Sequence, residues 1–276
     1  MRPVTPDDLL IRQKPVVSSD WGPEASASEA SEPSSGLVSL ERFQRLEMVL
    51  RNNPINADPY LELARIYLQS QRWVDAKRVL DRAIQQFSEN EDVISLREDA
   101  RLARSLELHH EAEEAHAAEP TMLTEEALQR SNVELNALRE RVCRSRLERH
   151  PDRVELYIPL ATALEKLGNT EEAINYLRLA VVVPSLRAAA ALQMGHVMRR
   201  ARRIPESLSF FRRAAMFRIP PPSAAIKREA LTAAADLSQR NNLIDSARRY
   251  VELLVEMSPS DEKLKQRLME LRNTPL

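Results

Sequence analysis

Glycine, aromatic residues and cysteine are all scarce in this chain of 276 residues, and each scarcity excludes a class of protein. The 4 glycines leave no room for glycine-rich phosphate loops, and an aromatic content of 4% argues against a β-sandwich. The single Cys143 excludes a disulfide within the chain. A formal net charge of −1 gives no overall attraction to nucleic acid or to a membrane. Alanine, leucine, glutamate and arginine dominate instead, and these residues favour helices.

Long apolar runs and catalytic motifs are missing as well. The amino end, MRPVTPDDLL, has no apolar core of a secretory signal. The most apolar region, residues 177–194, is interrupted by Arg178, Pro184 and Arg187, which a bilayer would penalise. None of the sequence motifs typical of nucleotide-binding, zinc-protease, serine-hydrolase or dithiol sites occurs. We therefore expect a cytoplasmic protein that is not an enzyme, has no cofactor and does not span a membrane.

A helix-turn-helix pattern begins at Val154 and recurs from Ala188, 34 residues later. Apolar residues at helical spacing form one face, a turn follows, and small residues line a second helix. Two antiparallel helices cross closely only where small side chains meet, which explains the recurring alanines and glycine. The positions that carry the pattern in its several copies are Tyr60, Leu63, Ala64, Ala76, Ala83, Leu160, Ala161, Gly168, Ala173, Ala180, Gly195, Phe211, Ala214 and Ala247.

This pattern resembles the tetratricopeptide repeat (TPR), whose repeat has the same length and the same order of bulky and small residues. The resemblance implies an all-α solenoid of stacked helical hairpins with one concave wall. It also implies a non-enzymatic scaffold that binds a protein or peptide of unstated identity on that wall. Here a long helical hairpin is expected to interrupt the array, and a disordered tail to precede it.

The predicted organisation has four parts. Residues 1–37 form a disordered tail rich in serine, glutamate and proline, which cannot bury enough apolar surface to fold. A capping helix and one repeat follow in residues 38–90, and a long charged hairpin in 91–150. The last part, 151–276, holds three repeats and a carboxy-terminal capping helix; the repeats are 154–187, 188–221 and 228–261.

The tail contains a group of apolar residues with two interpretations. It is either a solvated leader or a short peptide that docks elsewhere. The apolar residues are Leu9, Leu10, Ile11, Val16, Val17 and Trp21.

The predicted hairpin pairs a helix from Glu91 to about Ala118 with one from Thr124 to about Arg149, and we expect it to project from the array. A coiled-coil seam is expected at Leu128, Leu135, Leu138 and Val142, although Ser131 and Ser145 occupy the intervening heptad places and argue against a long one.

One cluster on this hairpin has metal-ligand spacing. His109, Glu113 and His116 share a helix face and could hold a divalent ion. A di-iron bundle would need a second Glu-x-x-His, which the chain lacks, so we expect a solvated acidic face and no metal.

The resemblance also indicates where a partner would bind, because TPR ligands usually contact the first helix of each hairpin. The family's clamp for chaperone tails is absent, since apolar Leu61, Ile158 and Leu192 and Thr232 occupy one of its places. The sequence does not exclude other peptides as ligands. The residues expected to face a partner are Arg65, Gln69, Thr162, Lys166, Gln193, His196, Arg199, Arg200, Asp236 and Arg240.

The near-zero net charge hides two poles. Between Glu89 and Glu126 there are 12 acidic and 3 basic residues, whereas His196 to Arg228 holds 1 acidic and 9 basic residues. Either the acidic hairpin docks on the basic pole, in the same chain or by self-association, or the basic pole receives an acidic partner segment. Alternatively, the two faces are separately solvated. Nucleic acid binding is the less favoured function, because Phe210, Phe211 and Phe217 have the pattern of core residues rather than of an exposed stacking platform.

Overall fold

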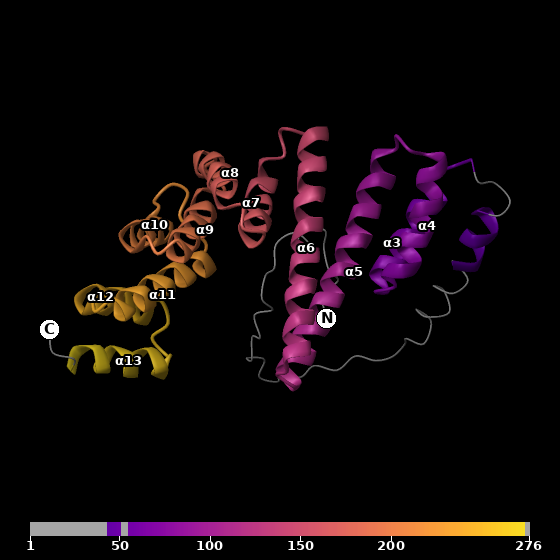
Figure 1. Ribbon diagram of the computed structural model, residues 1–276. Helices are drawn as coiled ribbons and strands as arrows, with labels where there is room; N and C mark the ends of the chain where they lie inside the picture. Colours follow the sequence, from indigo (N-terminus) through magenta and orange to yellow (C-terminus); the bar gives the residue numbers. More distant parts are fainter. Residues whose placement is uncertain (1–42, 51–54, 274–276) are drawn as a thin grey trace, which may run out of the picture. The chain divides into compact units, whose positions relative to one another are not determined.

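A computed structural model describes residues 43–50 and 55–273, and within these ranges the regular structure is entirely helical. This confirms the predicted all-α class and the array of helical hairpins (Figure 1). Residues 43–50 are helical, while the predicted tail and the start of the predicted capping helix lie outside the described residues. The helices are α3 (Asp58–Gln69), α4 (Trp73–Gln86), α5 (Glu91–Ala118), α6 (Met122–Arg149), α7 (Tyr157–Lys166), α8 (Thr170–Val182), α9 (Arg187–Arg200), α10 (Ile204–Met216), α11 (Ala224–Arg240), α12 (Ile244–Met257) and α13 (Glu262–Asn273).

The chain forms two compact units that divide between Leu138 and Arg139, inside α6. In the amino-terminal unit, α3 and α4 form one hairpin, and α5 packs against both. Val93 and Ala100 of α5 are fully buried in the same core as Leu63 of α3 and Leu80 of α4. The amino-terminal part of the long hairpin is therefore anchored on the first repeat.

Two histidines connect α5 to α6 within this unit. His109 Nδ1 lies 3.0 Å from the hydroxyl of Ser131, and His116 Nδ1 lies 3.1 Å from that of Thr124. The two pairs run in opposite directions along the helices, as an antiparallel hairpin requires.

In the carboxy-terminal unit, the hairpins α7/α8, α9/α10 and α11/α12 stack in chain order, and α13 packs on α12 (Figure 1). A 3₁₀ turn at Val154–Leu156 precedes α7. Pro159 lies in the first turn of α7, where its missing N–H costs little because the first amides of a helix have no partner within it.

The four hairpins share one steric register. At each helix crossing the first helix contributes Ala64, Ala161, Gly195 or Ala235, and the second helix contributes a small residue 12 positions later. These second positions are Ala76, Ala173, Ser207 and Ala247, and all four are fully buried. The larger buried residues four positions further on are Leu80, Leu177, Phe211 and Val251.

The turns inside the hairpins also share a geometry. Gly168 has a φ of 90°, and Gln71, Arg202 and Asn242 at the equivalent places have φ values of 58°, 57° and 57°. The next residue donates its amide to a carbonyl five residues back, as from Asn169 to Leu164 at 2.8 Å. This is the Schellman pattern, in which a left-handed residue ends a helix.

A longer connection precedes the last repeat. Seven residues, 217–223, join α10 to α11, whereas four residues, 183–186, join α8 to α9. In addition, α11 has 17 residues and α9 has 14. These two differences of three residues account for the six extra residues between Ser207 and Ala247.

Candidate partner-binding surface

The first helices of the carboxy-terminal hairpins, α7, α9 and α11, form one face together with α13, which we name the A-helix face. Contacts between polar side chains connect each of these helices to the next. Arg200 of α9 pairs with Glu165 of α7, and His196 Nε2 of α9 lies 3.4 Å from Glu229 Oε1 of α11. These contacts hold neighbouring repeats in register across their exposed edge.

The same pattern continues to the end of the unit. Arg267 of α13 contacts Asp236 of α11 at 2.7 Å and donates to the Gln239 amide oxygen at 2.8 Å. The capping helix α13 thus occupies the place of a further first helix.

Eight of the ten residues expected to face a partner lie in this unit, and they fall into three groups. His196, Arg200 and Asp236 are used in the pairs between repeats. Thr162 donates to the Ile158 carbonyl of its own helix at 2.9 Å, and Gln193 is half-buried.

The remaining three, Lys166, Arg199 and Arg240, are cations on three successive first helices. Lys166 and Arg240 are exposed and Arg199 is half-buried. Within residues 43–50 and 55–273, none of the three takes part in an ion pair.

In the amino-terminal unit, Arg65 and Gln69 line a cavity of about 620 Å³. Leu61 and Ile66 give it an apolar wall, and it also contains three carboxylates, those of Asp58, Glu62 and Asp92. The sequence prediction missed these carboxylates. Asp58 and Glu62 could have been found, because Glu62 lies one helical turn after Asp58 and one turn before Arg65 and Ile66, but Asp92 enters only because α5 packs beside α3.

The predicted basic pole is divided between surfaces. Arg199 and Arg200 belong to α9, whereas Arg203 and Arg213 line a groove of about 310 Å³ among α8, α9 and α10. Arg178 of α8 completes this rim and was missed because it lies one repeat earlier in the sequence. The floor is apolar, with Ile174, Val181, Met194, Met198 and Phe210.

Two contacts fix the arginines of this groove. Arg203 and Glu206 form a bidentate pair at 2.8 and 2.7 Å, and the hydrogen bonds from Arg203 lower the pKa of the Glu206 carboxyl. The guanidinium of Arg213 lies 5.5 Å from the ring centroid of Phe210. Phe211 is fully buried, and Phe217 is half-buried with Arg187 over its ring at 5.8 Å. These three phenylalanines offer no open stacking platform.

The candidate metal ligands are used in other contacts. His109 and His116 bond to α6 hydroxyls, and His109 Nε2 lies 3.5 Å from a Glu113 oxygen. Over the described ranges, no three His, Cys, Asp or Glu side chains form a group that could hold a metal ion. In the same ranges, no helix combines the length and the apolar character of a membrane span.

Comparison with known proteins gives two family matches. Tetratricopeptide repeat models match residues 43–100 and residues 154–181. No curated protein matches the sequence.

Among solved structures, YrrB, described as a TPR protein with an unusual peptide-binding site, is 15% identical, with a TM-score of 0.51 over 83% of this chain and 99% of that one. A tetratricopeptide repeat protein from Parabacteroides merdae is 13% identical (TM-score 0.40; 85% and 93% covered), and PilF of Pseudomonas aeruginosa is 15% identical (TM-score 0.40; 85% and 95% covered). At these identities the similarity to YrrB shows the fold alone. The two matched segments are thus tetratricopeptide repeats by sequence, and the similarity to YrrB shows that the chain has the fold of a tetratricopeptide repeat array.

Proposed function

We propose that this protein is a non-enzymatic scaffold that holds an acidic peptide segment of a partner on its A-helix face. Arrays of this kind present extended binding surfaces and bind proteins as a class. The finer assignment rests on one observation, the three cations Lys166, Arg199 and Arg240 on successive first helices. Neighbouring residues on this face already pair with carboxylates of the chain itself, so the surface is suited to receive further carboxylates.

The spacing of these cations sets a minimum length for the partner segment. Packed helices lie about 8–10 Å apart, so two steps from α7 to α11 cover roughly 20 Å. An extended peptide rises about 3.3 Å per residue, and about six residues therefore reach all three cations. The groove bounded by Arg178 and Arg213, in which Glu206 already pairs with Arg203, offers a second contact for acidic residues of the same partner.

The amino-terminal cavity suits the opposite charge. Its lining has three carboxylates and one arginine around an apolar wall. We propose that it takes a basic or neutral part of the partner. A partner that has segments of both kinds would place each segment against a surface of complementary charge.

A selection experiment with random peptides in place of the partner tests the A-helix face. Displayed peptides of about 12 residues, twice the minimum above, are selected on the full chain, and their affinities are then measured by fluorescence anisotropy. The test variant carries Lys166→Glu, Arg199→Glu and Arg240→Glu. The control carries Arg141→Glu, Arg212→Glu and Arg249→Glu, which are exposed outside this face and change the charge equally.

We expect acidic peptides, with affinities that fall roughly 10- to 100-fold in the test variant, since each exposed ion pair contributes up to about 1 kcal/mol. The control variant should bind within about twofold of the native chain on the same scale. Equal losses in both variants would show a non-specific charge effect. Selected peptides that bind the test variant as well as the native chain would refute the assignment of this face.

A further inference from the structure

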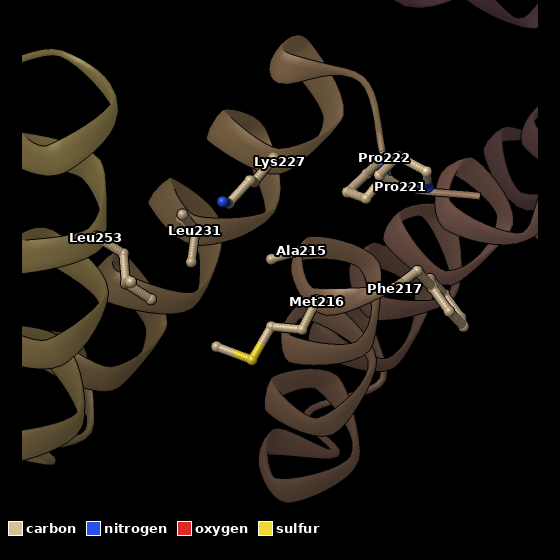
Figure 2. Close-up of a pocket in the computed structure, with 8 residues that line it drawn as sticks. All are labelled: Ala215, Met216, Phe217, Pro221, Pro222, Lys227, Leu231 and Leu253. Carbon is tan, nitrogen blue, oxygen red and sulfur yellow. The ribbon is translucent and has the colours of Figure 1, made fainter. Parts of the chain in front are cut away.

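A separate apolar cavity lies within the carboxy-terminal unit, where α10, α11 and α12 meet the connection at residues 217–223 (Figure 2). Figure 2 shows Leu231 and Leu253 on one side of it and the prolines of the connection on the other. Its volume is about 330 Å³. A cavity of ~150 Å³ takes one benzene-sized group, so this one has room for about two aliphatic side chains. The lining residues are Ala215, Met216, Phe217, Pro221, Pro222, Lys227, Leu231 and Leu253.

The connection that forms one wall of the cavity is held at both ends. Arg187 of α9 donates from Nη1 to the Ile219 carbonyl at 3.4 Å, and its guanidinium lies 5.8 Å from the centroid of the Phe217 ring. At the other end, the Ser223 hydroxyl accepts from the Ile226 amide at 3.3 Å and caps α11. The prolines between these ends have fixed φ angles and no backbone N–H. This wall is therefore stiff and mainly apolar.

The surroundings of the cavity are positively charged. Residues 207–228 contain five basic residues and no acidic residue. Lys227 is the charged residue of the lining. In the described part of the carboxy-terminal unit, no carboxylate forms an ion pair with Lys227, Arg187 or the exposed Arg218. An occupant that brings carboxylates to these cations is favoured over a neutral or basic one.

We propose that this cavity binds a peptide segment of a partner protein in which aliphatic side chains stand directly beside Asp or Glu. The aliphatic side chains lie against Met216 and Leu231, and the carboxylate lies at Lys227. Met216 is 51% exposed and Ile219 of the connection is 82% exposed, so apolar surface of the chain is also buried on binding. The concave shape suits inserted side chains rather than a flat lipid surface.

This site is separate from the A-helix face and does not depend on the function proposed for that face. Lys227 lies in the first turn of α11, and Arg240 is its last residue. The 13 residues of helix from one to the other span about 20 Å. The two sites are therefore tested independently of each other.

Displayed random peptides of about eight residues, which extend over roughly 26 Å, are the probe. They are selected on the full chain carrying Lys166→Gln, Arg199→Gln and Arg240→Gln, so that the cations of the A-helix face do not contribute. The affinities of the selected peptides are then measured by fluorescence anisotropy.

Two variants of this chain are compared. The cavity variant adds Met216→Glu and Lys227→Glu. The matched control adds Leu179→Glu and Arg141→Glu, which change the charge equally and do not line the cavity. Leu179 is 52% exposed, close to the value for Met216, and Arg141 is exposed on α6. Melting temperatures check that both variants fold.

We expect the selected peptides to share Leu, Ile, Val or Met next to Asp or Glu. Their affinities should fall about tenfold or more in the cavity variant and less than about twofold in the control. Lys227→Glu alone should lower the affinity by up to about fivefold. A peptide whose acidic residues are replaced by lysine should instead bind the Lys227→Glu chain more tightly than the chain with Lys227, a reversal that a purely structural effect would not produce.

Three results would overturn the proposal. The first is a set of selected peptides without aliphatic residues beside acidic ones. The second is equal binding to the cavity variant and the control, or no reversal with the lysine peptide. The third is binding of phosphatidylserine vesicles, lost in the cavity variant, without selection of any peptide, which would assign this surface to a membrane.

Discussion

Gly195→Ala tests the close crossing of α9 and α10. A Cβ at this position of α9 would lie 2.5 Å from both Cδ1 and Cε1 of Phe211 and 3.1 Å from its Cγ. Phe211 is fully buried on α10, and the His196 ring packs against it with centroids 5.0 Å apart. The aromatic ring is rigid, so the contact is relieved only by moving the ring or the helix.

Two opposing effects set the magnitude. Alanine favours the helix over glycine by about 1 kcal/mol. Inserting a methyl group into a closely packed crossing costs typically 1–3 kcal/mol, and the three short contacts to one ring point to the upper part of that range. We expect a net loss of about 1–2 kcal/mol in the free energy of unfolding. Gly195→Leu should cost more, because its side chain must displace the whole ring.

Urea unfolding followed by circular dichroism measures this loss, and a double-mutant cycle assigns its cause. Phe211→Leu alone removes ring atoms and leaves a cavity, which is destabilising. In the double variant, the new Cβ occupies part of that cavity, so the combined loss should be smaller than the sum of the single losses by about 1 kcal/mol or more. A Gly195→Ala protein as stable as the native one, or strictly additive losses, would refute the close crossing.

Three further predictions concern the turns, a tyrosine and the capping helix. Gly168→Ala should lower the free energy of unfolding by about 1 kcal/mol and Arg202→Gly should raise it by up to about 1 kcal/mol, because both positions have a positive φ; urea midpoints that move the other way would contradict this. Burial, followed by the charge of Glu47, raises the pKa of Tyr67 above 10.0. The contribution of this pKa shift to stability is therefore fully present below pH 10.0 and is lost as the pH rises through the folded-state pKa. Tyr67→Phe should reduce this loss of stability at alkaline pH, as measured by urea unfolding. Arg267→Ala should cost less than about 1 kcal/mol and speed amide hydrogen exchange in α13, with α7 as the internal control.

The hairpins could be predicted from the sequence because their packing depends on side-chain size at fixed intervals. Ala161 and Ala173 meet across one crossing and Ala235 and Ala247 across another, and only small residues allow two helices to approach so closely. In each hairpin, 12 residues separate the small residue of the first helix from the small residue of the second helix. The pattern is local, so a single sequence is enough to show it.

The ion pairs of the A-helix face could not be predicted in the same way. Helical spacing indicates that Glu165 and Arg200 face outward, but it does not indicate that they contact each other. They are 35 residues apart and belong to different hairpins, so their contact depends on how one repeat stacks on the next. The sequence therefore predicts which residues could face a partner, but it does not predict that His196, Arg200 and Asp236 contact neighbouring helices.

Ser207 departs from the repeat pattern, and its contacts with neighbouring residues explain this departure. It stands where the other hairpins have alanine, and a buried hydroxyl without a partner would destabilise the crossing. Its Oγ donates to the carbonyl of Gly195 at 2.7 Å. Gly195, which leaves space for the Phe211 ring, thus also supplies the acceptor for Ser207. The three residues together determine the packing at this crossing. Ser207→Ala should therefore be tolerated better than Gly195→Ala, because the first change removes donor and desolvation cost together while the second forces the ring to move.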